Sequence, residues 1–250
     1  MKIVACYSNK GGVGKTATAV NLAYASAMNG NRTLLCDLDP QGASGFYFRV
    51  KPSMQLKDKS FFQNSENIVP AIRESDYQNL DLLPANLTFR DFDIFLSRMK
   101  NSRSRLQQAL QAINSEYQVI ILDCPPNISL LSENIFKAVD IIVVPVIPTT
   151  LSVRSLEQLY EFFSDKKYRK RKLLPFFSMV QQSKNLHRET MNSLRKEYKR
   201  FLNSYIPFST DVEKMGIHRA PLWTCAAKEE SADAYRTIWN DIEKIAKIKT

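Results

Sequence analysis

The stretch KGGVGKT, from Lys10 to Thr16, decides the fold. It directly follows a short apolar run, Lys2–Tyr7, and directly precedes a helical pattern, Lys15–Met28. Glycines between a strand and a helix let the backbone N–H groups and the helix N-terminus surround phosphate groups. A lysine followed by a hydroxyl residue supplies the cation for the β- and γ-phosphates and a ligand for Mg²⁺. The predicted phosphate contacts are Lys10, Gly11, Gly12, Val13, Gly14, Lys15, Thr16 and Ala17.

This loop differs from the usual pattern GxxxxGK[ST] at its first position. Asn9 stands where the first glycine is expected, and Lys10 precedes a compact GGVGKT. The remaining glycines still meet the steric demand of a phosphate-binding loop. We therefore expect a nucleotide site, with Lys15 at the phosphates and the Thr16 hydroxyl on Mg²⁺.

Short apolar runs alternate with amphipathic segments along the chain. This alternation predicts an α/β fold with a doubly wound, mainly parallel sheet and helices on both faces, formed by a single domain over residues 1–250. The expected strands are Lys2–Tyr7, Thr33–Asp37, Leu80–Pro84, Tyr117–Asp123, Ala138–Val146, Leu173–Met179 and Tyr205–Ile206. The expected helices are Lys15–Met28, Ser65–Ser75, Arg90–Ser115, Ser152–Phe163, Leu186–Phe201 and Ala232–Ile248, and Arg49–Gln63 is expected to be a surface excursion.

Composition excludes several classes of protein. The apolar runs are too short and interrupted to span a bilayer, and no signal peptide precedes the glycine-rich loop. The cysteines (Cys6, Cys36, Cys124 and Cys225) lack the spacing of metal ligands, so we expect reduced thiols in a cytoplasmic protein. With two histidines, a histidine-based metal site is not expected.

Three aspartates follow apolar strands. Asp37 and Asp39 come at the end of TLLCD and just after it, and Asp123 ends the run VIILD. The carboxyl ends of strands in a doubly wound sheet face the ligand crevice, so these carboxylates are predicted to lie near the nucleotide. Asp123 is the expected Walker B aspartate of the Mg²⁺ coordination sphere.

The order KGGVGKT, DLDPQG (Asp37–Gly42) and DCPP (Asp123–Pro126) resembles the ParA/MinD family of deviant Walker A ATPases. The later segments PVIPTTLSVRSLEQL (Pro145–Leu159) and GIHRAPL (Gly216–Leu222) resemble its ParA branch. The likeness is to the short ParA-type proteins, since no helix-turn-helix domain precedes the loop.

The resemblance implies roles for particular residues. Lys10 matches the signature lysine that reaches the nucleotide of a dimer partner, and Lys15 and Asp39 complete the implied catalytic set. Asp39 would orient the attacking water close to Mg²⁺, with Asp37 supporting the Mg²⁺ shell or the loop. The implied metal residues are Thr16, Asp39 and Asp123, and Pro207 and Phe208 lie where relatives hold the adenine.

A strongly basic stretch, Ser164–Arg200, carries twelve Lys or Arg against three acids, which accounts for +9 of the net charge of +10. Such a patch favours a polyanion through phosphate contacts, and the resemblance implies DNA bound without sequence readout. Tyr168, Tyr198 and Phe201 interleave with it, and Lys244, Lys247 and Lys249 could add to it. The predicted DNA-binding residues are Lys167, Arg169, Lys170, Arg171, Lys172, Arg195, Lys199 and Arg200.

The expected function is that of a positioning ATPase associated with the nucleoid. ATP and Mg²⁺ would drive a homodimer that binds DNA, and a ParB-like or cargo-adaptor partner would stimulate hydrolysis, to segregate a plasmid or chromosome or to position a protein cargo. The alternative is a membrane-associated relative of MinD type, although the C-terminal segment NDIEKIAKIKT is poor in bulky apolar residues. An iron–sulfur ATPase would need paired cysteines, and Lys10 with DLDPQG disfavours a small-molecule kinase.

Overall fold

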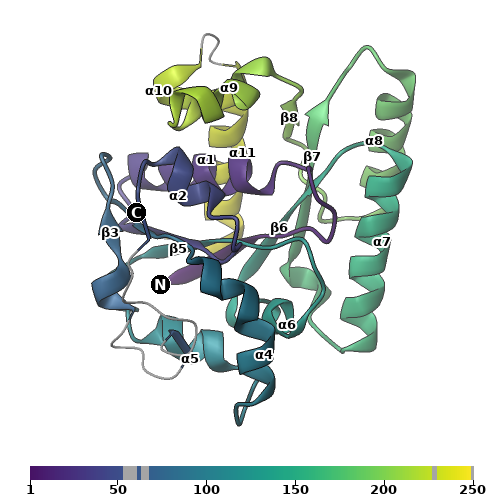
Figure 1. Ribbon diagram of the computed structural model, residues 1–250. Helices are drawn as coiled ribbons and strands as arrows, with labels where there is room; N and C mark the ends of the chain where they lie inside the picture. Colours follow the sequence, from purple (N-terminus) through teal and green to yellow (C-terminus); the bar gives the residue numbers. More distant parts are fainter. Residues whose placement is uncertain (53–60, 63–67, 227–229, 249–250) are drawn as a thin grey trace.

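Eight strands form one sheet in the order β3-β4-β2-β5-β1-β6-β7-β8 (Figure 1). The computed structural model describes residues 1–52, 61–62, 68–226 and 230–248. Neighbouring strands are parallel, except that β3 runs antiparallel to β4 at one edge. The strands are β1 (Lys2–Cys6), β2 (Thr33–Asp37), β3 (Arg73–Glu74), β4 (Leu80–Leu83), β5 (Val119–Asp123), β6 (Ile141–Val146), β7 (Leu173–Val180) and β8 (Tyr205–Pro207).

Helices and short helical turns connect the strands. The α-helices are α1 (Lys15–Met28), α2 (Ala43–Tyr47), α4 (Phe92–Ser97), α5 (Arg105–Gln111), α6 (Leu130–Ala138), α7 (Thr150–Asp165), α8 (Asn185–Glu197), α9 (Thr210–His218), α10 (Leu222–Cys225) and α11 (Glu230–Ala246). The 3₁₀ turns are η2 (Val69–Ala71), η3 (Leu87–Asp91) and η4 (Lys170–Lys172).

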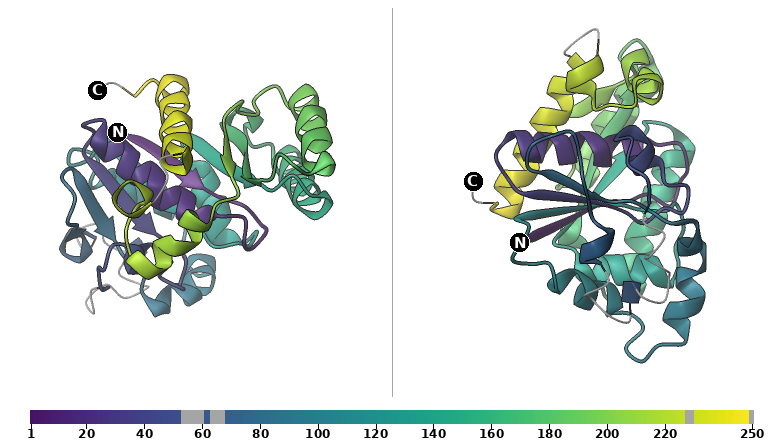
Figure 2. Two further views of the ribbon diagram at one scale, coloured as in Figure 1. Left: turned by 90° about the horizontal axis from the view of Figure 1, so that it is seen from above. Right: turned by 60° about the vertical axis from the view of Figure 1, so that its left-hand side comes forward.

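The sheet separates two hydrophobic cores. Along β1, Val4 and Cys6 belong to the core beneath α1 and α11, whereas Ile3 and Ala5 face the other core. That second core is covered by α4, α5, α6, α7 and α8, and Figure 2 shows the two helical layers on opposite faces of the sheet. Both faces are buried, as expected for near-continuous apolar strands. The predicted doubly wound, mainly parallel fold is confirmed.

Most predicted elements occur close to their expected bounds, and two of the predicted helices do not. The helix expected over Ser65–Ser75 is wrong where the structure describes it, because that part holds the turn η2 and the edge strand β3. The helix expected over Arg90–Ser115 is interrupted between α4 and α5, where Asn101 adopts a left-handed φ of 56°. Asparagine tolerates that conformation better than most residues, so the chain turns there.

Other corrections concern helices that the sequence did not reveal. Residue Ala138 ends α6 and does not begin a strand, and α2 and α9 lie in segments where no helix was expected. Most of Arg49–Gln63 lies outside the described residues, but Phe61 and Phe62 are buried against η3 and α4 and are not on the surface.

The cysteines behave as expected. Cys6, Cys36 and Cys124 are free and buried, and Cys225 is free and half-buried. Among the described helices, none combines the length and apolar character needed to cross a bilayer.

Candidate nucleotide site

The glycine-rich loop connects the central strand β1 to the N-terminus of α1. Gly12 and Gly14 have φ angles of 71° and 90°, which L-residues with a side chain rarely adopt. A Cβ at Gly11 or Gly12 would meet no atom within 4 Å, so open space lies above this part of the loop. A Cβ at Gly14 would lie 3.3 Å from Ser178 Oγ, because the end of β7 packs closely there. The loop is therefore shaped for a ligand on one side and for close packing on the other.

Lys15 folds its side chain back over this loop. Its Nζ donates a 3.2 Å hydrogen bond to the backbone oxygen of Lys10, and the residue is only 8% exposed. Burial lowers the pKa of Lys15, while the charges of Asp123 and Asp39 act to raise it. The ammonium thus lies between the loop and the carboxylates. Its hydrogen bond goes to a neutral acceptor, which a phosphate would replace with a stronger, charged one.

Two strand ends bring Asp37 and Asp123 side by side. These residues are register partners in the β2–β5 pair, and both are almost fully buried. Asp37 Oδ1 accepts from Asp39 N at 3.1 Å, and its Oδ2 accepts from Ser44 N at 3.0 Å. Asp37 therefore holds the backbone of the loop after β2. Burial raises the pKa of Asp37, and the neighbouring Asp123 raises it further.

Asp39 lies at the rim, half-buried, with Oδ1 accepting from Gln41 N at 3.0 Å. It acts electrostatically on both Lys15 and Asp123. The structure thus separates the two aspartates of DLDPQG: the buried one braces the loop, and the accessible one faces the site.

Ser44 ties the two buried aspartates together, and the sequence analysis missed it. Its hydroxyl donates to Asp123 Oδ2 at 2.8 Å while its backbone N–H bonds to Asp37, and its exposed fraction is 0%. Ser44 is the second residue of α2. Gly42, which directly precedes this helix, has a left-handed conformation, and the turn at Gly42 places Ser44 next to the end of β5. In the sequence, the only signal for Ser44 is a hydroxyl residue shortly after the acidic segment Asp37–Gly42.

The residues around Asp123 fit a hydrated Mg²⁺. Asp123 Oδ1 is buried without a hydrogen-bond partner, which is costly unless a ligand or water completes it. Burial raises the pKa of Asp123 to about 6, and hydrogen bonds from Ser44 and Thr16 oppose that rise. Within the described ranges, no group of three or more His, Cys, Asp or Glu could hold a metal. Mg²⁺ commonly keeps several waters beside one or two protein oxygens, which is what Thr16 and Asp123 offer.

The remaining predicted nucleotide residues lie at two places. Lys10 is half-exposed at the tip of the loop, and its N–H donates to Ser8 Oγ at 3.2 Å. Pro207 ends the edge strand β8, and Phe208 N donates to Val180 O at 2.9 Å while the residue is 49% exposed. Lys10 therefore joins the loop site directly, whereas Pro207 and Phe208 lie on the outermost strand beyond β7.

The predicted DNA-binding residues divide into exposed and internally bonded groups. Lys172 Nζ donates to Phe136 O at 2.9 Å, and the Arg195 guanidinium donates to Asn203 O at 2.6 Å above the Phe177 ring. These two side chains are part of the fold. The exposed members are Lys167, Arg169, Lys170, Arg171, Lys199 and Arg200.

The aromatic residues between them do not form a stacking surface. Phe201 is buried and stacks on Phe177 with ring centroids 4.1 Å apart. Tyr168 donates its hydroxyl to Glu133 Oε2 at 2.9 Å, and Tyr198 packs against Tyr160. The expectation that these rings would support DNA binding is not matched by their packing.

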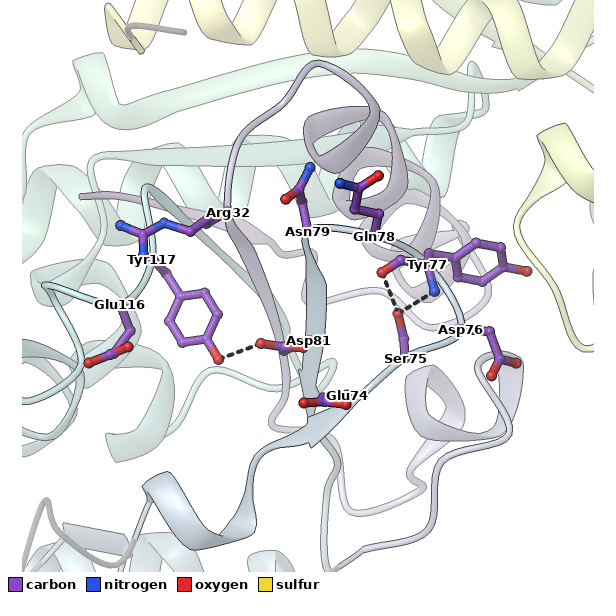
Figure 3. Close-up of a pocket in the computed structure, with 10 residues that line it drawn as sticks. All are labelled: Arg32, Glu74, Ser75, Asp76, Tyr77, Gln78, Asn79, Asp81, Glu116 and Tyr117. Atoms are coloured by element: carbon purple, nitrogen blue, oxygen red, sulfur yellow. Dashed lines mark hydrogen bonds between the residues drawn. The ribbon is translucent and has the colours of Figure 1, made fainter.

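A separate acidic cavity of about 430 Å³ lies at the β4 edge (Figure 3). Its wall includes Tyr117, whose hydroxyl donates to Asp81 Oδ2 at 2.8 Å, and Arg32. Arg32 and Tyr117 precede β2 and β5, so this cavity opens at the end of the sheet opposite the glycine-rich loop. It takes no part in the nucleotide site.

Known proteins resemble this chain over the part that contains the glycine-rich loop and the strand-end aspartates. A family model described as an AAA domain matches residues 1–176. The sporulation initiation inhibitor protein Soj of Bacillus subtilis (strain 168) is 28% identical over 248 residues, covering 96% of this chain and 98% of Soj. The chromosome partitioning protein ParA of Myxococcus xanthus (strain DK1622) is 35% identical over 158 residues, covering 62% of this chain and 56% of that protein.

Among solved structures, a complex of a Cyanothece McdA variant with ATP has the same fold. Its TM-score is 0.83 at 18% sequence identity, with 100% of this chain and 98% of McdA covered. The likeness in fold and the matched family model agree with the strand–loop–helix geometry described above. The chain therefore belongs to the AAA domain family and has ParA-type partition proteins among its relatives.

Proposed function

We propose that this protein is a ParA-type positioning ATPase whose single domain spans residues 1–250. MgATP bound on the loop joins two copies into a homodimer, and the dimer holds DNA through its backbone phosphates. A partner protein stimulates hydrolysis, which dissolves the dimer and releases the DNA. The protein would act in the cytoplasm on the nucleoid, to segregate a plasmid or chromosome or to position a protein cargo.

One observation carries the proposal: the loop lysine and the strand-end carboxylates converge on one small volume. Lys15 Nζ rests on Lys10 O, and the Asp123 Oδ1 atom is buried without a hydrogen-bond partner. The N–H groups of the loop and Lys15 would hold the phosphates. Thr16 and Asp123 would hold Mg²⁺ with its waters, and Asp39 would orient the attacking water. Bound Mg²⁺ would supply neutralisation of the charge that develops on the phosphates.

Lys10 supports the dimer within this proposal. Its backbone belongs to the loop of its own site, but its side chain is half-exposed and available to a second copy. A cation reaching across an interface stabilises the transferring phosphoryl group in the way that an arginine finger does. Dimer formation and hydrolysis are then coupled through one residue.

The exposed basic residues support DNA as the polyanion. The charge is concentrated in one stretch, and contacts to backbone phosphates need no base readout. A dimer doubles the number of contacts, so nucleotide state controls DNA retention through avidity.

The alternative of a MinD-type membrane protein is disfavoured by the last helix. Three apolar residues of α11, Ile238, Trp239 and Ile242, are fully buried in the core beside α1. They are not available to enter a bilayer, and Ile245 alone is 40% exposed near the end of the helix.

The test compares four proteins by light scattering and by retention on duplex DNA, with ATP, with ADP and without nucleotide. The unaltered protein should dimerise and bind DNA only with MgATP. Lys15→Gln should do neither, and Lys10→Ala should bind ATP as a monomer. Lys100→Ala, which removes an exposed lysine elsewhere, is the matched control. A Lys10→Ala protein that dimerises and hydrolyses normally would refute the dimer proposal.

A further inference from the structure

A basic cavity lies at the amino ends of the parallel strands, at the end of the sheet away from the nucleotide loop. Its volume is about 550 Å³. Lys2 begins β1, Asp140 precedes β6, Lys172 precedes β7 and Lys247 follows α11, so four distant segments meet here. The glycine-rich loop leaves the opposite end of β1, so the cavity is separate from the nucleotide site. The basic residues of its wall are Lys2, Lys137, Arg169, Arg171, Lys172, Arg200 and Lys247.

The wall has a large excess of positive charge. Among the described residues of the wall, Asp140 is the acidic one; its Oδ2 accepts from Ile3 N at 2.9 Å and its Oδ1 lies 3.8 Å from Lys2 Nζ. Asp140 is thus already committed to the start of β1. Seven cations against one carboxylate give the wall a formal charge of +6. A cleft lined by one sign of charge focuses the field and concentrates counter-ions.

Lys172 shows that the cavity is built into the fold. Its Nζ donates to the backbone oxygens of Phe136 and Lys137, at 2.9 and 3.2 Å, and so caps the C-terminus of α6. The cap neutralises the negative end of the helix, which would otherwise repel an anion at this point. Burial lowers the pKa of Lys172; the charge of Asp140 acts to raise it, and the nearby charges of Arg169 and Arg171 act to lower it.

Three arginines of the wall have guanidinium groups available to a ligand. Over the described part of the chain, no ion pair or hydrogen bond engages the side chains of Arg169, Arg171 or Arg200. Guanidinium groups bind phosphate oxygens with two parallel hydrogen bonds, which a lysine cannot do. The cavity has the size of a small-molecule site, larger than a single phosphate needs.

We propose that this cavity binds a free polyphosphate chain, as a second anion site distinct from the loop at Lys10–Thr16. The three arginines bind successive phosphate groups, and Lys137 and Lys247 add positive charge to the same wall. The proposal goes beyond the ATPase and does not require DNA binding. Lys167, Lys170 and Lys199, which do not line the cavity, then remain the candidates for DNA contact.

The test uses inorganic tripolyphosphate, titrated calorimetrically at physiological salt without magnesium. All proteins carry Lys15→Gln, so that the nucleotide loop does not compete for the probe. The cavity variant adds Arg169→Gln, Arg171→Gln and Arg200→Gln; these residues are exposed, and a melting curve checks that it folds. The matched control replaces three exposed lysines outside the cavity, with Lys51→Ala, Lys100→Ala and Lys214→Ala.

We expect one tripolyphosphate per chain, more than tenfold weaker binding in the cavity variant, and less than a twofold change in the control. An equal loss in both triple variants, or no saturable binding, overturns the proposal. A second arm adds duplex DNA at equal phosphate concentration. Tripolyphosphate should stay bound; its complete displacement would also overturn the proposal and make the cavity part of the DNA surface. Failure of DNA binding alone affects only the proposed ATPase function.

Discussion

Ser44 Oγ donates a 2.8 Å hydrogen bond to Asp123 Oδ2, joining the turn after β2 to the end of β5. The same residue bonds through its backbone N–H to Asp37. One buried serine therefore holds two carboxylates in place whose mutual repulsion would otherwise move them apart. The carboxylate that we propose to face Mg²⁺ is positioned by a residue outside the nucleotide loop.

Ser44→Ala should weaken the response to Mg²⁺ more than the response to ATP. A buried carboxylate that loses a donor is destabilised by about 1–3 kcal/mol and is freer to rotate. We expect the Mg²⁺ concentration for half-maximal hydrolysis to rise about tenfold, corresponding to about 1.4 kcal/mol, with little change in KM for ATP. Ser152→Ala removes another buried hydroxyl, which bonds Ile147 N, and is the control. Equal Mg²⁺ curves for the two variants would contradict the positioning role.

Asp39→Ala should trap the dimer bound to ATP. Loss of a residue that orients the attacking water lowers hydrolysis by about 10²–10⁴-fold, while the phosphate contacts of Lys15 remain. Light scattering should show a persistent dimer with ATP, still retained on DNA. Asp76→Ala, at an exposed position outside the basic stretch, should behave as the unaltered protein. A variant that stays monomeric with ATP would show that Asp39 has another role.

Asp123→Asn should stabilise the protein free of nucleotide and metal at high pH. The pKa of Asp123 is raised from 3.8 to about 6 in the fold, so the folded state holds the proton more tightly than the unfolded state. Its contribution to stability is therefore present below about pH 4 and is lost as the pH rises through about 6.

Urea unfolding checks this prediction. The variant should gain on the order of 2–3 kcal/mol at pH 8, by the conversion of a pKa shift to free energy, and much less at pH 4. It should also fail to hydrolyse ATP. Asp76→Asn, at an exposed carboxylate, should change little at either pH. If the gain is independent of pH, the ionised carboxylate is not the destabilising group.

DNA retention should depend on exposed charge and on salt. Replacing Lys167, Lys170 and Lys199 by alanine removes three exposed cations without breaking an internal bond found in the described residues. The slope of log affinity against log salt should fall by about 0.9 for each DNA phosphate that the variant no longer neutralises. Filter binding over a salt series measures the slope, with the Lys51, Lys100 and Lys214 triple variant as control. An unchanged slope would place the DNA surface elsewhere.

The core of the fold could be read from the sequence because local signals agreed with one another. Glycines after an apolar strand, followed by a helix pattern, located β1, the loop and α1 within one residue. Continuous apolar runs located β5 and β7 for the same reason, since strands buried on both faces need no alternation. The predictions for Ser65–Ser75 and Arg90–Ser115 failed although these segments have helical propensity. Tertiary packing favours a turn or an edge strand there over a continuous helix.

The sequence by itself determined the chemistry of the loop, because glycines between a strand and a helix, followed by Lys15 and Thr16, bring backbone N–H groups, a cation and a hydroxyl to one place. The sequence also supplied the candidate carboxylates, since the carboxyl ends of parallel strands lie at the same end of the sheet. Only the tertiary structure decided which of them is buried, which one Ser44 holds, and that Lys172 and Arg195 support the fold. It alone gathered Lys2, Arg200 and Lys247 into one cavity. Distances between residues far apart in sequence depend on strand order and packing, and no local pattern specifies them.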